Sequence, residues 1–448
     1  MTTLFCVLLA ILAPAQTDAR LANASRQDKA GWIYLHLQGK PRDIGYQYGC
    51  LAAADIDDAH KALVATSFAT APYNWEWART TAKELFWKKL DPEYQYEIEG
   101  QAEGLKAKGL AYDAWDVLAY NAYIELRDYY IPYLQAKKTG DRRGTARESC
   151  SAFIATGTTT KDGKIVMGHN LWWDYVMGQR CNLILDITPD KGNRVMMDAF
   201  CGFIHSGSDF ALNSAGIVLC ETTIAGFAGF DPSGMPEFMR MRKAIHYSTS
   251  LDDAVKIFKD GNNGGYANSW LIGDTKTNAI GKLELGLKNV NFTRKSDGYL
   301  VGSNFPEDPK LIAEEVPGGW NTDPKTNGCE DRRARWNTLL TENKGKVDVE
   351  MTKTFLADTY DQANDIHGAS GSTLCGRDDA ALVGATNTKI VDAGMVSNMT
   401  LWAKMGFSDG SAFSAADFLQ ANTSRANLKP YLRDVTNQPW TIFPPAAK

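Results

Sequence analysis

The chain changes character at Glu148-Ser149-Cys150-Ser151-Ala152-Phe153-Ile154-Ala155. Residues 135–149 are polar and basic and include two glycines, Gly140 and Gly144. Such composition is typical of an exposed connector that is open to proteolysis. Residues 151–155 are apolar and favour a buried strand. Cys150 therefore lies where a connector meets the first strand of a sheet.

The two sides of this junction predict different secondary structure. Apolar residues recur at helical spacing over 41–134, where Gly45 and Gly49 share one helix face and allow another element to approach closely. After the junction, Asp162-Gly163 predicts a hairpin turn between strands at 151–155 and 165–167. Further strands are predicted at 183–187, 194–200, 216–220, 270–273 and 279–285, and helices at 237–246, 251–258 and 332–340. Helices followed by consecutive strands predict a layered α+β architecture.

The overall composition is that of a globular protein. The chain has 448 residues, of which 44% are hydrophobic and 23% charged, with a net charge of −5. This length usually means two domains, although one large mixed sheet with flanking helices can use it all. Because no basic patch is concentrated anywhere along the chain, a nucleic-acid partner is not expected.

The first fifteen residues are typical of a secretory signal peptide. An apolar run over 4–12 precedes Ala13-Pro14-Ala15, a cleavage site of the small-x-small type, although no Lys or Arg comes before the run. The run is too short to span a bilayer. We therefore expect a secreted protein, or one of the lysosomal or periplasmic lumen, without stable membrane insertion.

Export makes the cysteines informative. Eight are present, and removal of Cys6 with the signal peptide leaves seven. An odd number in an oxidising compartment predicts at least one free thiol, with disulfides among the others. Four Asn-x-Ser/Thr triplets also favour an exported glycoprotein; they begin at Asn23, Asn291, Asn398 and Asn422.

Cys150 is the leading candidate for a nucleophile. Cleavage of the bond before it would give the residue a free α-amine, whose ordinary pKa of about 7.7 to 8.0 suits a base near neutral pH. One residue would then supply both nucleophile and base. The alternative is a bridged or buried structural cysteine.

The sequence around Cys150 resembles a known group of enzymes. The stretches Cys150-Ser151-Ala152-Phe153 and Gly168-His169-Asn170-Leu171-Trp172-Trp173-Asp174-Tyr175 are similar to the start of the catalytic chain in cysteine-type N-terminal-nucleophile hydrolases. The phospholipase B-like proteins and the peptidase C45 group, which includes penicillin acyltransferases, are the most similar. Further segments that resemble the group are 41–49, 97–104, 266–270, 374–377 and 384–389.

The resemblance implies a four-layer αββα sandwich with a helical N-terminal segment. It also implies autocatalytic cleavage between Ser149 and Cys150. Residues 16–149 would form a small chain or propeptide, and residues 150–448 the catalytic chain, with both fragments associated in one domain. Cys150 would hold the substrate's acyl group as a thioester, without a metal or other cofactor.

Several further residues are candidates for catalysis. Asn268 is the best candidate for an oxyanion donor, with a turn role as the alternative. His169, beside Asn170, would orient the thiol or the amine, or else have a structural role. Related bile-salt and penicillin hydrolases carry Arg where His169 stands and Asp where Trp172 stands. This leaves Asp174 as a substitute for that acid, with a solvated turn residue as the alternative.

Substrate binding is assigned to apolar and cationic side chains. Trp172 and Trp173 would line an acyl pocket, or else pack in the core. Arg335, with Arg332 and Arg333 on the same predicted helix, would meet a substrate carboxylate, or else lie on a solvated face. The sequence thus predicts a hydrolase of linear amides or esters acting on a small acyl substrate. An acyltransferase and a catalytically silent lipid- or ligand-binding protein are the alternatives.

Overall fold

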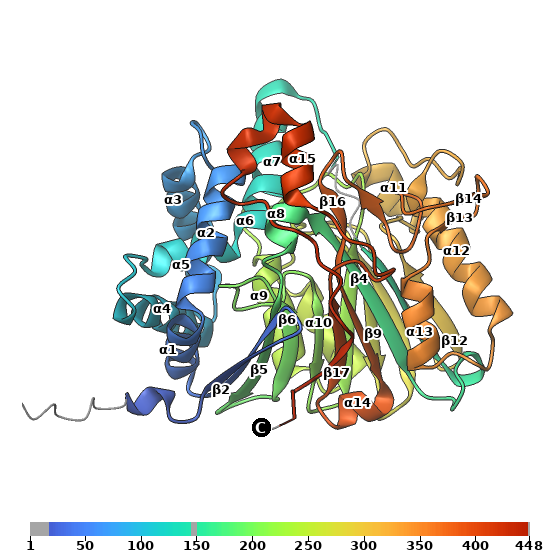
Figure 1. Ribbon diagram of the computed structural model, residues 1–448, viewed down its shortest axis with the longest axis horizontal. Coiled ribbons are helices and arrows are strands. Elements are labelled where there is room, and N and C mark those ends of the chain that lie inside the picture. Colours follow the sequence, from blue (N-terminus) through green and yellow to red (C-terminus); the bar gives the residue numbers. More distant parts are fainter. Residues whose placement is uncertain (1–17, 145–149, 447–448) are drawn as a thin grey trace, which may run out of the picture.

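Two large β-sheets organise the computed structural model, which describes residues 18–144 and 150–446 (Figure 1). The nine-stranded sheet consists, in spatial order, of β1 (Ser25–Lys29), β2 (Trp32–Gly39), β5 (Leu183–Pro189), β6 (Val195–Ala199), β7 (Phe210–Asn213), β8 (Ile217–Thr223), β9 (Asn268–Asp274), β10 (Ala279–Leu285) and β11 (Val290–Lys295). The seven-stranded sheet consists of β12 (Gly298–Gly302), β3 (Ser151–Thr156), β4 (Val166–Asp174), β16 (Val383–Asp392), β17 (Leu401–Met405) and β18 (Thr441–Phe443), with β15 (Arg377–Asp378) paired to β16. A small hairpin joins β13 (Tyr360–Asp361) to β14 (Ile366–His367).

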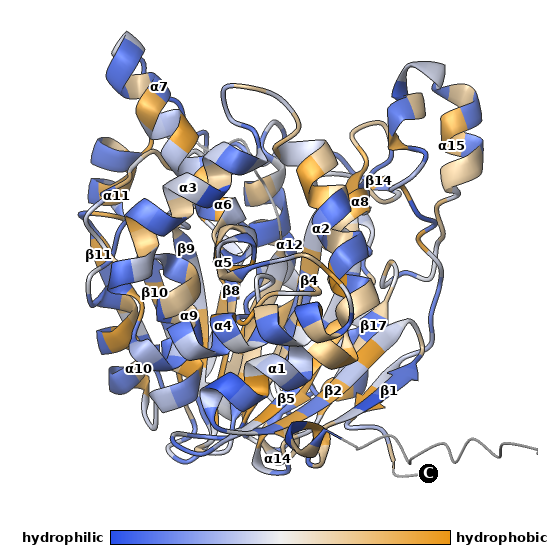
Figure 2. Cartoon of the chain, turned by 90° about the vertical axis from the view of Figure 1, so that its left-hand side faces the viewer, coloured by the Kyte–Doolittle hydropathy of each residue, from blue (hydrophilic) through white to orange (hydrophobic). Residues whose placement is uncertain are grey.

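Helices form two groups along the chain. Before Cys150 come α1 (Pro41–Leu51), α2 (Ala53–Ser67), α3 (Trp75–Phe86), α4 (Pro92–Ala107), α5 (Ala114–Asn121), α6 (Tyr123–Glu125), a π-helical turn (Leu126–Tyr130) and α7 (Ile131–Thr139). After it come α8 (Tyr175–Gly178), α9 (Glu237–Tyr247), α10 (Leu251–Lys259), α11 (Pro309–Glu315), α12 (Gly328–Glu342), α13 (Val349–Leu356), α14 (Ala393–Ser397) and α15 (Ala415–Ala421). Helices α7 and α15 project from one end of the molecule (Figure 2).

The two sheets share one hydrophobic core. Trp32, Ile184 and Phe210 of the nine-stranded sheet belong to the same buried cluster as Met167 and Leu401 of the seven-stranded sheet. A second cluster covers the other face of the nine-stranded sheet with side chains of α1 to α6, α9 and α10. A third packs α12 and α13 against the seven-stranded sheet. The fold is therefore of the mixed α/β kind, consistent with the predicted α+β class.

Most predicted elements are present. The hairpin around Asp162-Gly163 is the antiparallel pair β3–β4, and helices fill 41–139 with short breaks. Strands β1 and β2 are absent from the prediction. They pair with each other in a hairpin in which Lys29 lies opposite Trp32, and β2 also lies parallel to the distant β5, with Ile33 opposite Leu183, a pairing that local patterns do not report. The chain before Cys150 and the chain after it therefore contribute to one sheet.

Helices α1 and α4 cross at very short range. A Cβ atom on Gly45 would lie 1.9 Å from the Glu97 carbonyl oxygen, and one on Gly104 would lie 2.3 Å from that of Tyr46. Only glycine permits such an approach between two backbones. This confirms the close packing that the spacing of Gly45 and Gly49 predicts.

The predicted disulfides are not found among the described residues. None of the seven described cysteines forms a disulfide, and all seven are buried. Several of their sulfur atoms donate to oxygen atoms, as for Cys50 with the Gly104 carbonyl (3.5 Å) and Cys201 with the Asn182 side chain (3.4 Å). The expectation of bridged cysteines is therefore wrong for this part of the chain.

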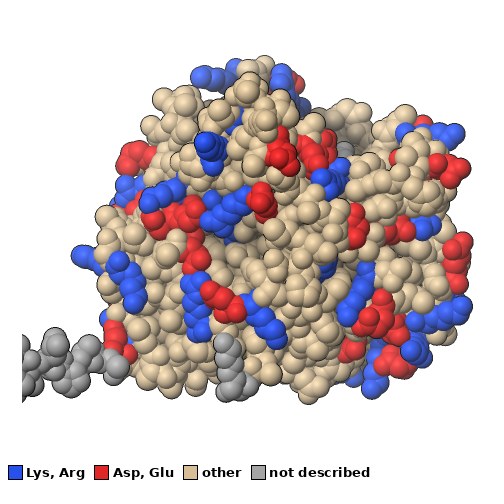
Figure 3. Space-filling view, viewed as in Figure 1, with Lys and Arg blue, Asp and Glu red and all other residues tan. Residues whose placement is uncertain are grey.

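Other predictions about export concern the surface or the chain ends. Residues 1–15, assigned to a signal peptide, lie outside the described residues, and so does Ser149. The four glycosylation-type asparagines are all exposed. Acidic and basic side chains are interspersed on the face that Figure 3 shows. Within residues 18–144 and 150–446, no helix is both long and apolar enough to cross a membrane.

Candidate active site

Cys150 lies directly before β3 in a strained backbone conformation. Its φ of 105° is rare for a residue other than glycine. The Arg332 guanidinium on α12 holds its carbonyl oxygen at 2.6 Å and also donates to the Asn304 side-chain oxygen (3.2 Å). Such strain persists only where the surrounding structure fixes it. Arg332 is one such constraint.

The thiol of Cys150 faces a buried carboxyl group. Its sulfur lies 3.9 Å from Oε1 of Glu221, on β8 of the opposite sheet. Tyr266 donates its hydroxyl hydrogen to the same oxygen (3.1 Å). Asn268, at the start of β9, donates to the other oxygen (2.8 Å) with its amide in the orientation that satisfies both of its side-chain atoms. Both sheets thus contribute side chains to one polar cluster.

Burial controls the protonation of this cluster. It raises the pKa of the Cys150 thiol well above its usual range, and the neighbouring Glu221 raises it further. Burial likewise raises the pKa of Glu221 well above its usual value, with Asp209 as the next contribution. The thiol is therefore protonated at neutral pH, and reaction requires a base that takes its proton.

A buried ion pair lies beside the cluster. Lys389 on β16 and Asp198 on β6 are fully buried and 2.8 Å apart, and Ser206 donates to Asp198 (2.8 Å). Burial and Asp198 together raise the pKa of Asp209 to about 8. The carboxyl oxygens of Asp209 have no hydrogen-bond partner in the described part of the chain.

His169 lies on β4, opposite Ala152 of β3 and Lys389 of β16. It is fully buried, and neither ring nitrogen has a hydrogen-bond partner among residues 18–144 and 150–446. Burial, followed by Lys389, lowers its pKa well below the usual value. The ring is therefore neutral, and it does not bond to the Cys150 sulfur in this state of the chain.

The neighbouring candidates Asn170 and Asp174 are engaged elsewhere. Asn170 donates to the carbonyl oxygens of Leu356 (2.8 Å) and Leu374 (2.9 Å). Asp174 accepts the backbone N–H of Met177 and so caps α8. Both side chains therefore hold structural elements in place around the site.

The candidates for substrate binding divide in the same way. The ring of Trp172 lies 4.7 Å from the Arg332 guanidinium and so belongs to the surroundings of Cys150. Trp173 packs against Phe200. Arg335 forms two hydrogen bonds with Asp358, of 3.1 and 2.7 Å. The structure thus brings Asn268, Trp172 and Arg332 to the site, whereas Arg335 pairs with Asp358.

Glu221 and Asn304 are site residues that the sequence interpretation missed. Glu221 does carry a signal, because it is an acidic residue that directly continues the apolar strand run 216–220. Asn304 carries none, since only the folded chain shows its φ of 70° and its contact with Arg332.

An apolar pocket of about 440 Å³ is linked to the cluster through one of its lining residues, Tyr129. Tyr129, Tyr133, Phe227 and Phe230 line it, and Tyr129 also accepts the backbone N–H of Ala267 (3.1 Å), next to Asn268. The volume is in the range of small-molecule sites. No group of three or more His, Cys, Asp or Glu suited to a metal ion occurs among the described residues.

Comparison with known proteins places this chain in a family. The chain is 25% identical to an uncharacterized protein of Archaeoglobus fulgidus over 438 residues, which cover 90% of this chain and 70% of the relative. It is 22% identical to human phospholipase B-like 1 over 378 residues (74% and 66%), and 26% identical to phospholipase B-like protein G of Dictyostelium discoideum over 189 residues (40% and 28%). The family model for phospholipase B matches residues 45–338, more than half of the chain. The chain therefore belongs to the phospholipase B family.

Proposed function

We propose that this protein is an acyl hydrolase that cleaves a linear amide or ester bond through the thiol of Cys150. In this proposal the chain first cuts itself between Ser149 and Cys150. Membership of the phospholipase B family supports hydrolysis, and the surroundings of Cys150 support the nucleophile. The four-layer αββα fold of N-terminal-nucleophile hydrolases is part of the same proposal.

One observation carries the proposal: Cys150 combines a strained backbone, a clamped carbonyl and a thiol that touches a carboxyl group. A structural cysteine needs none of these features. Strain of order 1–3 kcal/mol at one residue favours a reaction that releases it. Cleavage of the peptide bond before Cys150 would free its φ angle from this constraint.

In the cut protein, the new α-amine would act as the base for its own thiol. The sulfur attacks the acyl carbon of the substrate, the leaving group departs with a proton, and a thioester remains. Asn268 is a suitable donor for the oxyanion because its amide group is uncharged, buried and within the cluster. Water then releases the acid.

The surroundings of the site support an apolar acyl group in the substrate. The pocket that includes Tyr129 has a mainly apolar surface, with aromatic rings beside the charged Asp128, Lys137, Arg142 and Arg143, and so suits a hydrocarbon chain that carries a polar group. The parallel pairing of β2 with β5 supports continued association of the two fragments after the cut. Export through a signal peptide, to the outside or to a lumen, completes the proposal.

Intact-mass measurement tests the nucleophile. The wild-type chain should yield two fragments, the larger of which begins at Cys150, whereas a Cys150→Ala variant should stay whole. The cut protein should hydrolyse acyl amides or esters in a way that iodoacetamide stops. Normal processing of Cys150→Ala would refute self-cleavage. Transfer of the acyl group to an added amine in preference to water would identify an acyltransferase.

A further inference from the structure

Self-cleavage needs a base other than the α-amine of Cys150, which is available only for turnover by the cut enzyme. Before the cut, the nitrogen of Cys150 belongs to a peptide bond and carries no basic lone pair. The α-amine that serves the mature enzyme is therefore unavailable for the first reaction. Some other group must accept the thiol proton, because the thiol itself is protonated at neutral pH. This reasoning rests on the proposed function of Cys150.

The contacts of the Cys150 sulfur limit which group can accept the thiol proton. Among the described residues, Glu221 is the side chain that accepts a hydrogen bond from the Cys150 thiol. The backbone N–H of Trp172 also faces the sulfur, but as a donor it cannot take a proton. Lys389 is held by Asp198 at 2.8 Å.

We infer that Glu221 is the proton acceptor for self-cleavage, a step distinct from turnover by the cut enzyme. Its carboxylate takes the thiol proton while the sulfur bonds to the carbonyl carbon of Ser149. The bond between that carbon and the Cys150 nitrogen then breaks, and the nitrogen takes up a proton to become the amine. Water finally hydrolyses the thioester and leaves a carboxyl group on Ser149.

The neighbours of Glu221 equip it for this role. Tyr266 and Asn268 hold one oxygen each, which fixes the carboxyl group against the thiol. Burial and Asp209 raise its pKa, whereas Tyr266, Lys389 and the thiol lower it. A more distant buried acid, Glu237, also faces the cluster. A carboxylate with a raised pKa is a stronger base than an exposed one.

The pH dependence of self-cleavage follows from this assignment. Glu221 accepts a proton only when ionised, so the rate should rise with pH and level off above the pKa of Glu221. The rate would be measured on freshly translated full-length chain shifted to a series of pH values. A Glu221→Gln variant should cut itself at least about 100-fold more slowly, within the usual contribution of a general base, and should lose the pH step.

Glutamine suits the test because it fits the same space. Its amide can donate to the Asn268 oxygen if that amide turns over, so the packing is kept. Glu221→Asp keeps the base but withdraws it by one methylene, and should give an intermediate rate. Glu125→Gln is the matched control: Glu125 is also buried, with a pKa raised to about 7, but it bonds to Asn263 (2.6 Å).

The outcomes separate this inference from the proposed function. If Glu221→Gln cuts itself at the wild-type rate with the same pH profile while Cys150→Ala stays whole, the inference is wrong and the nucleophile stands. If Cys150→Ala is cut normally, the proposed function itself fails. A loss of self-cleavage in Glu125→Gln equal to that in Glu221→Gln would also overturn the specific role of Glu221. Thermal unfolding of each variant reports whether it has folded.

Discussion

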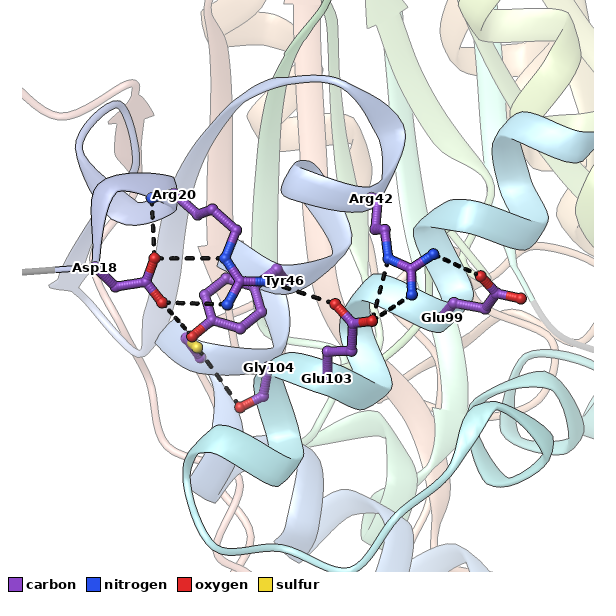
Figure 4. Close-up of polar contacts among 8 residues, drawn as sticks. Asp18, Arg20, Arg42, Tyr46, Glu99, Glu103 and Gly104 are labelled. Carbon is purple, nitrogen blue, oxygen red and sulfur yellow. Dashed lines mark hydrogen bonds and ion pairs between the residues drawn. The ribbon is translucent and has the colours of Figure 1, made fainter.

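Two charged regions of this molecule differ in their exposure to water. The first joins α1, α4 and the residues before β1 at the surface, where Arg42 contacts Glu99 and Glu103 and Arg20 lies 3.3 Å from the centre of the Tyr46 ring (Figure 4). Its Arg and Glu side chains are 35–50% exposed. The second surrounds Cys150, where Lys389 and Asp198 are fully buried.

The two regions differ in what takes the place of an ion-pair partner when that partner is removed. At the surface, water and salt ions replace it, so each ion pair contributes little. Around Cys150 nothing replaces it, and an unpaired buried charge is costly. The shifted pKa values of Cys150, Glu221 and Asp209 occur in the second region for this reason. Strongly shifted pKa values are typical of catalytic sites, so we expect the catalytic residues in the second region.

The largest effect should come from breaking the buried ion pair. Lys389→Met keeps most of the side-chain volume but leaves Asp198 without its cation. Removing one partner of a buried pair typically costs about 3–5 kcal/mol. Urea denaturation should show this loss in the free energy of unfolding. The double variant Lys389→Met with Asp198→Asn should recover much of it, and a loss below about 1 kcal/mol in the single variant would contradict the contrast.

The next effect concerns what joins α1 to α4 beneath the surface charges. Gly45→Ala places a methyl group against the Glu97 carbonyl, so the helices must separate. Overpacking usually costs about 1–3 kcal/mol, and here it outweighs the gain of about 1 kcal/mol in helix propensity. Because the clash is with backbone atoms, we expect a net loss towards the upper end of the difference, about 1–2 kcal/mol by urea denaturation.

Gly371→Ala is the control for that substitution. Nothing lies within 4 Å of the added methyl group at this position, so the free energy of unfolding should hardly change. Equal losses in both variants would mean that the helix crossing is not the cause. If Gly45→Ala is as stable as the wild type, the surface ion pairs, and not the close helix crossing, hold α1 against α4.

The same contrast explains what the sequence could predict. The hairpin at Asp162-Gly163 and the helices over 41–139 follow from local patterns, and the structure contains them. The place of β2 in the nine-stranded sheet could not be predicted, because its second partner, β5, lies far along the chain. Periodicity reports which face of an element is buried, but not against which distant segment it packs.

The site shows the same limit. Cys150 stands out by its place in the sequence, and its φ and its contacts emerge only on folding. Arg332 and Arg335 are three residues apart on one helix, yet one reaches Cys150 and the other pairs with Asp358. Spacing puts both on similar faces, and only tertiary packing decides between them.

A pH-dependent effect should come from Asp209. Its pKa of about 8 in the folded protein lies above the ordinary value of about 3.9, so between these values the folded chain holds a proton that the unfolded chain has lost. The free energy of unfolding therefore falls as pH rises through this window. Asp209→Asn should remove that part of the slope, and it tolerates the φ of 57° well.

Urea denaturation at pH 5 and pH 8 checks this. The stability of the variant relative to the wild type should increase by about 1–2 kcal/mol from pH 5 to pH 8, a discounted value because each pKa unit corresponds to at most about 1.4 kcal/mol. A constant difference at both values would show that Asp209 is ionised throughout. In that case the positive charge of Lys389 would have to compensate the buried negative charge of Asp209.

The smallest effect is expected for Arg42→Ala in the surface network. Arg42 contacts two carboxylates, but half of its side chain is exposed, and Arg20 stays beside Glu103 after the change. The loss should be below about 1 kcal/mol and should shrink further in 1 M salt, where screening acts within about 3 Å. Urea denaturation in low and high salt measures both quantities. A loss as large as that of Lys389→Met, or a loss that salt does not reduce, would mean that Arg42 acts through packing on α4. The surface network would then resemble the buried cluster around Cys150.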